Sequence, residues 1–136
     1  MRKRTFFGIS AGFALIVASG MGIMPPSTDL SAAGAAKTSF AEDILPLLKW
    51  RCGSCHQSGG AGYEKSGLDL TTYVGVMKGT KFGAMVIPKE PESSNLMLLL
   101  DWRVSRALRM PHDKKQLSTC DRDAIRNWIR EGALNN

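Results

Sequence analysis

The chain has 136 residues, enough for one domain and a terminal segment, and its hydrophobic fraction of 43% is ordinary for a small globular protein. The formal net charge is +6, and from Lys37 onward 15 basic and 11 acidic side chains leave +4. This mild excess would steer the protein towards an acidic partner, but it excludes the strongly basic surface of a nucleic-acid-binding protein.

Residues 1–36 have the layout of an export signal. Three basic residues, Arg2–Arg4, precede a charge-free and mostly apolar stretch at 6–24, and small residues before Lys37 offer cleavage sites. The apolar stretch is nearly long enough to span a bilayer, so an uncleaved membrane anchor is the alternative. In both cases we expect residues 37–136 to form a domain in the periplasm or on the outer face of the cytoplasmic membrane.

The first helix should begin at Ser39, which forms a capping box with Glu42. Apolar residues then recur at every fourth position: Phe40, Ile44, Leu48 and Cys52. This spacing predicts one buried face of a helix, which Pro46 should bend or interrupt.

Cys52, Cys55 and His56 form a Cys-x-x-Cys-His motif, the attachment signature of c-type haem. Two thiols three positions apart on a short turn can add to the two vinyl groups of one porphyrin, which gives two thioether bonds. The histidine is then held beside the ring with its imidazole towards the iron. We therefore predict one covalent haem c, with His56 as an iron ligand.

The cysteines have two alternative interpretations. A thioredoxin-like redox pair would need no following histidine and usually lies near a βαβ pattern. A zinc site would need further ligands such as His112 and Cys120, and the sequence holds no second paired Cys/His cluster. If haem takes two of the three cysteines, no intrachain disulfide can form.

Shorter elements are expected in the middle of the chain. The glycine-rich stretch 57–67 predicts a flexible surface loop, and residues 73–78 predict a short helix that ends at Gly79. Another helix should begin near Pro91 and continue to about Trp102 or Val104, buried on several sides. Three arginines follow at spacing three: Arg103, Arg106 and Arg109. They predict a solvated basic face or, alternatively, a propionate-pairing or docking patch.

The Met110-Pro111 pair presents a methionine from a loop, because proline fixes the backbone and removes an N–H donor. A methionine thioether is a soft, neutral ligand that raises the potential of haem iron. Met110 is therefore the predicted second axial ligand, and Met85 is its main rival. Met77 and Met97 lie at helical positions and are expected in the core.

The last helix should begin after Ser118, bury Trp128 and stop near Gly132. Cys120 lies in its first turn, where the pKa of a thiol should be depressed. This cysteine is an alternative axial ligand, a candidate for an intermolecular disulfide, or an inert thiol. His112 is expected at the surface, with an alternative ligand role as the second interpretation.

This ordered set of motifs, from Phe40 to Ala133, resembles class I c-type cytochromes, and more closely the small cytochrome c-like domains of planctomycete-type periplasmic proteins. The resemblance implies an all-α fold with three to five helices around one haem. It implies that the first and last helices cross at an aromatic pair, here Phe40 and Trp128. It also implies that His56 and Met110 are the iron ligands.

The predicted function is one-electron transfer between redox proteins, by a periplasmic or membrane-anchored monohaem cytochrome. Because the sequence shows no acid–base pair or nucleophile constellation, we predict no substrate turnover and no enzyme activity of its own. The alternatives are a haem subunit of a larger oxidoreductase or respiratory complex, a catalytic or gas-sensing haem with a displaceable ligand, and a zinc-bound structural module.

Overall fold

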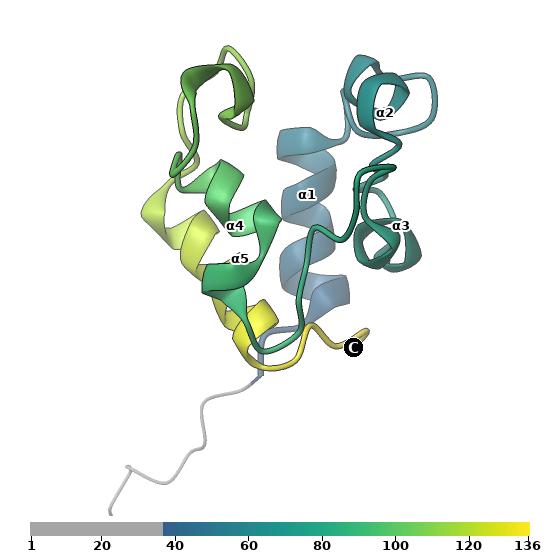
Figure 1. Cartoon of the computed structure of the whole chain (residues 1–136). Helices are drawn as coiled ribbons and strands as arrows, with labels where there is room; N and C mark the ends of the chain where they lie inside the picture. The colour runs from purple at the N-terminus through teal and green to yellow at the C-terminus, as the bar shows by residue number, and fades with distance from the viewer. Residues whose placement is uncertain (1–36) are drawn as a thin grey trace, which may run out of the picture. The chain divides into compact units, whose positions relative to one another are not determined.

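The structure, a computed structural model, describes residues 37–136 as short helices joined by loops, with no strand among these residues. The α-helices are α1 (Leu45–Cys52), α2 (Ala61–Ser66), α3 (Tyr73–Lys78), α4 (Asn95–Leu100) and α5 (Thr119–Arg130). The shorter turns are η2 (Phe40–Ile44), η3 (Pro91–Ser93) and η4 (Arg106–Leu108). In Figure 1, α1 lies between α2 and α3 on one side and α4 and α5 on the other. The predicted all-α fold is confirmed.

The expected export signal or anchor lies in residues 1–36, outside the described residues. Among residues 37–136, the helices are all too short or too polar to cross a membrane.

Ser39 begins the first helical segment as predicted, but Glu42 does not complete the capping box. The Ser39 hydroxyl accepts the Glu42 N–H at 3.1 Å, whereas the Asp43 carboxylate accepts the Ser39 N–H at 2.8 Å. The reciprocal acceptor therefore lies one residue later than expected. Pro46 is the second residue of α1, close to the point where the helix changes from the π pattern of η2 to the α pattern of α1. Ile44 and Leu45 keep helical backbone angles, so the predicted interruption is only this change of hydrogen-bonding pattern.

The core forms where η2 crosses α5. Phe40 and Trp128 are buried there with their ring centroids 5.3 Å apart, as predicted. Tyr73 adds a third ring that the sequence did not indicate, edge-on to Phe40 at 5.1 Å. Its hydroxyl donates to the Ala133 carbonyl at 2.9 Å, so this ring also fixes the C-terminal segment. Each such aromatic contact adds about 1 kcal/mol beyond simple burial.

The stretch 57–67 is not the flexible loop that its glycines predicted, because it contains α2. The Tyr63 N–H donates to the Cys55 carbonyl at 2.9 Å, so a contact with the preceding turn supports this six-residue helix. Gly67 ends the helix with φ at +74°, a conformation that favours glycine. The next helix, α3, has the predicted bounds.

The single helix predicted from Pro91 is two segments, η3 and α4, and α4 ends earlier than expected, at Leu100. Ser94 lies between them in an extended conformation and is fully buried. Its hydroxyl accepts the Ile87 N–H at 2.9 Å and donates to the Glu90 carbonyl at 2.8 Å. These bonds satisfy backbone groups outside the helices and favour the break over a continuous helix.

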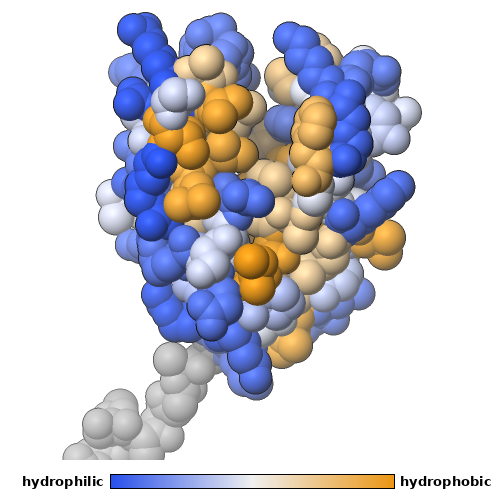
Figure 2. Space-filling view, viewed as in Figure 1, coloured by the Kyte–Doolittle hydropathy of each residue, from blue (hydrophilic) through white to orange (hydrophobic). Residues whose placement is uncertain are grey.

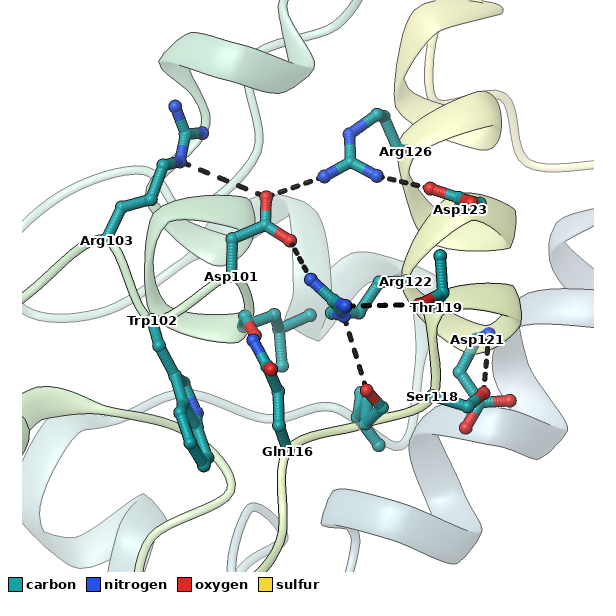
Figure 3. A network of polar contacts seen from close by, with 12 residues as sticks. Asp101, Trp102, Arg103, Gln116, Ser118, Thr119, Asp121, Arg122, Asp123 and Arg126 are labelled. Atoms are coloured by element: carbon teal, nitrogen blue, oxygen red, sulfur yellow. Dashed lines mark hydrogen bonds and ion pairs between the residues drawn. The ribbon is translucent and has the colours of Figure 1, made fainter.

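An ion network joins the end of α4 to α5. Asp101, with 10% of its side chain exposed, contacts Arg122 at 2.8 Å and Arg126 at 2.6 Å, as Figure 3 shows. Arg103 belongs to the same network through Glu92, at 3.0 Å. Arg103 is exposed, as a solvated face requires, but its charge is paired with Glu92, so the three spaced arginines do not form a purely basic face.

The other two spaced arginines differ from each other. The Arg109 guanidinium lies 5.3 Å from the centroid of the Trp102 ring and is half-buried, whereas Arg106 is exposed. The three therefore share a spacing in the sequence but not a common environment.

Candidate functional site

An apolar cavity of about 680 Å³ lies between α1 and α2 on one side and the segment from α4 to Pro111 on the other. Figure 2 shows the surface hollowed at this place, with apolar side chains facing the hollow. All four predicted haem residues line it: Cys52, Cys55, His56 and Met110. Leucine is the commonest residue in its walls, with eight positions that include Leu48, Leu68, Leu70, Leu96 and Leu99. The volume lies in the range of roughly 300–1,000 Å³ that is usual for cofactor sites.

The two cysteines lie on the turn that follows α1, the last residue of which is Cys52. The Cys52 carbonyl accepts the N–H groups of Cys55 and His56, at 3.1 and 2.9 Å, so local backbone bonds fix the motif. Burial raises the pKa of Cys52 to about 11, although the nearby Arg51 acts in the opposite sense. The Cys52 thiol is therefore protonated at neutral pH, while Cys55 is exposed at the mouth of the cavity.

His56 is half-buried, and its Nδ1 atom is buried without a hydrogen-bond partner among the described residues. Burial lowers the pKa of His56, and the backbone of Leu68 opposes this only in part. The imidazole is therefore neutral near pH 7, which is the form that ligates metals. The unsatisfied nitrogen fits an imidazole that ligates iron.

Gly62, in α2, lies against the His56 ring. A Cβ atom at this position would be 2.8 Å from Cε1 and 2.9 Å from Nε2 of the imidazole. Such distances are shorter than van der Waals contact, so the ring can occupy this place because residue 62 has no side chain. The sequence showed only a glycine-rich stretch here and gave no sign of this contact.

Met110 lies between η4 and α5, on the segment that Figure 1 shows across from α2. Its N–H donates to the Leu99 carbonyl at 3.2 Å, and its carbonyl accepts the Trp102 indole N–H at 2.9 Å. Met85 also lines the cavity and is buried, so the rival ligand reaches the same space. Met77 and Met97 pack in or against the core, as predicted.

The two alternative ligands are placed differently. Cys120 is exposed on α5 and is not among the residues that line the cavity. His112 is exposed at the rim of the cavity, where its Nε2 atom lies 3.3 Å from the Asp113 carboxylate. Within residues 37–136, no group of three or more His, Cys, Asp or Glu side chains is arranged to hold a metal ion by itself.

Taken together, the donors fit haem c. Two thiols on one turn, a neutral imidazole with an unsatisfied nitrogen and a thioether from a distant loop meet in a cavity walled by leucines. The assignment of His56 and Met110 as iron ligands stays a prediction.

Residues 52–113 match a family model described as Planctomycete cytochrome C. The comparisons with curated proteins and with solved structures gave no significant match. The matched range begins at the first cysteine of the motif and includes Met110, so it spans all four residues of the cavity. Residues 52–113, which form most of the cavity, are therefore similar to the planctomycete cytochromes c.

Proposed function

We propose that this protein transfers single electrons as a monohaem c-type cytochrome. The observation that carries the proposal is the meeting of Cys52, Cys55, His56 and Met110 in one apolar cavity. When bound, haem c supplies an iron that gains and loses one electron. The cytochrome c-like domain implies this cofactor, and the single motif among the described residues supports one haem.

Four residues of the cavity would hold the haem in two different ways. The thiols of Cys52 and Cys55 would hold the haem by two thioether bonds. His56 and Met110, which come from opposite sides of the cavity, would ligate its iron. The leucine walls exclude water, and the thioether of Met110 favours the reduced state and so raises the potential.

Absorption spectra test this assignment, with the protein expressed alongside the haem c maturation system. Met110→Ala should abolish the far-red band that marks methionine bound to ferric iron. Met85→Ala is the matched control, because this methionine lines the same cavity. Loss of the band in Met85→Ala alone would assign the ligand to Met85, and a colourless wild-type protein would refute haem binding altogether.

The expected site of action is outside the cytoplasm, in the periplasm or on the outer face of the cytoplasmic membrane. The signal-like composition of residues 1–36 supports this location, and residues 6–24 would serve as the anchor if they are not removed. The protein would act either as a carrier or as a subunit of a larger redox complex. Peptide mass analysis of the N-terminus after expression distinguishes a cleaved signal from a retained anchor.

The partners that we propose are redox proteins with an acidic surface. Trp50 is 80% exposed, and the Arg51 guanidinium lies 4.8 Å from the centroid of its ring. Together with Lys114 and Lys115 these side chains border a second hollow of about 510 Å³. Arg51 and Lys114 border the haem cavity as well, so a partner bound here would lie close to the cofactor.

The charge on this surface can be tested with ferricyanide, an anionic one-electron oxidant. Lys114→Glu with Lys115→Glu should slow oxidation several-fold at low ionic strength and little at high salt. Lys78→Glu with Lys89→Glu changes the net charge equally, away from this hollow, and should have a smaller effect. Equal slowing by both pairs would show that only net charge matters.

A further inference from the structure

We infer that Trp102 is a positioning residue for Met110, an inference that rests on the proposed role of Met110 as iron ligand. The Trp102 indole N–H donates to the Met110 carbonyl at 2.9 Å. Trp102 does not line the cavity, so it acts on the site only through the backbone of the methionine.

With this bond, both backbone polar groups of Met110 are hydrogen-bonded. The Met110 N–H donates to the Leu99 carbonyl, in the last turn of α4, at 3.2 Å. The Leu99 carbonyl also accepts the Trp102 N–H at 3.3 Å. One carbonyl near the end of α4 therefore anchors both the methionine and the tryptophan that holds it.

The backbone of Trp102 is itself unusual. Its φ angle is +59°, in the left-handed region that bulky residues seldom adopt. Trp102 immediately follows Asp101, which the ion network ties to α5, and in Figure 3 the indole points away from that network. A strained conformation persists only where its surroundings enforce it. Here it directs the indole towards the loop that carries Met110, which we call the methionine loop.

Arg109 covers the indole from one side. Its guanidinium lies 5.3 Å from the centroid of the Trp102 ring, and its Nε donates to the Val104 carbonyl at 3.5 Å. Because Arg109 directly precedes Met110, the tryptophan contacts two consecutive residues of the loop. The side chain of Met110 can then remain at the iron without help from regular secondary structure.

Imidazole binding to the ferric haem-loaded protein tests the inference, because imidazole competes with Met110 for the iron. Trp102→Phe keeps an aromatic ring and removes the N–H donor. We expect its affinity for imidazole to rise about fivefold, the factor that one ordinary hydrogen bond represents. Trp50→Phe is the matched control at an 80% exposed position and should change the affinity less than about twofold.

Equal affinities in Trp102→Phe and Trp50→Phe would overturn the inference while leaving the ligand assignment intact. A wild-type spectrum without the methionine–iron band would instead refute the proposed function and the inference with it. A second measurement needs no variant: the indole proton of Trp102 should exchange with solvent more slowly than that of Trp50. Equal exchange rates for the two indole protons would likewise overturn the inference.

Discussion

The two sides of the haem cavity are built in different ways. On the His56 side, the predicted ligand lies four residues after Cys52, and the Cys52 carbonyl accepts its N–H at 2.9 Å. On the Met110 side, the predicted ligand lies in a loop without regular structure, and residues 8 and 11 positions earlier hold its backbone. One side is therefore fixed by local contacts, and the other by the packing of distant segments.

The two sides therefore differ in how far away along the chain the residues lie that hold each predicted ligand in place. The Cys-x-x-Cys-His turn keeps its geometry as long as α1 is folded, since its bonds lie within a few residues of each other. The methionine loop keeps its geometry only while α4 and α5 stay together, because Asp101 joins the two helices just before the loop begins. We therefore expect the Met110 side of the cavity to lose its structure before the His56 side when the protein is denatured.

The largest expected effect comes from removing the charge of Asp101. Asp101→Asn leaves Arg122 and Arg126 without their shared carboxylate, and breaking such a largely buried pair costs roughly 3 kcal/mol. Chemical denaturation should show this loss, with the methionine–iron band disappearing at lower denaturant than the helical signal. Asp123→Asn is the control, since that carboxylate is half exposed and its pair with Arg126 should contribute at most about 1 kcal/mol. Simultaneous loss of both signals would refute the weaker-side interpretation.

The same substitution should also change how the free energy of unfolding depends on pH. Burial alone would raise the pKa of Asp101, but hydrogen bonds from Arg122 and Arg126 outweigh it and hold the pKa below the ordinary 3.8. A carboxylate with a lowered pKa stabilises the fold above its ordinary pKa and loses that effect as pH falls through the lowered value. The difference in unfolding free energy between wild type and Asp101→Asn should be constant above about pH 5 and shrink below pH 4. A difference that grows in acid would contradict this ion network.

The contrast between the sides also explains what the sequence could predict. The motif turn and the bounds of α3 follow from spacing and turn residues, which are local signals, whereas the Phe40–Trp128 crossing was expected only from the resemblance to class I cytochromes. The helix α2 was missed because two of its flanking residues and one inside it are glycines, and a contact to Cys55 stabilises it. The Asp101 network and the Trp102 contact join residues that carry no common pattern, so only the folded chain shows them.

A smaller effect is expected on the His56 side, from Gly62→Ala. The added methyl group would lie 2.9 Å from the imidazole Nε2 and 3.0 Å from the Cys55 carbonyl. Overpacking typically costs about 1–3 kcal/mol, and the better helix propensity of alanine returns about 1 kcal/mol, so we expect a net loss of roughly 1 kcal/mol. The His56 ring should also shift, which would lower the yield of covalently loaded protein.

The control for this substitution is Glu64→Ala, exposed on the same helix and outside the cavity lining. Haem stain per unit of protein, measured for both variants and the wild type, reports the loading. Normal loading in Gly62→Ala together with an unchanged His56 ring resonance would show that the cavity adapts, and that close contact with α2 does not fix the ligand.

The smallest effect is expected from Cys120→Ala. The thiol is exposed on the first turn of α5 and lies outside the cavity lining, so its removal should change stability by less than about 0.5 kcal/mol. The absorption spectrum and the reduction potential should match those of the wild type, which titration in both redox directions can measure. A changed spectrum would mean that the thiol reaches the iron in the loaded protein. Because Cys120 lies ten residues after Met110, that result would require the chain between them to rearrange. The Met110 side of the cavity could then supply either Met110 or Cys120 as the iron ligand.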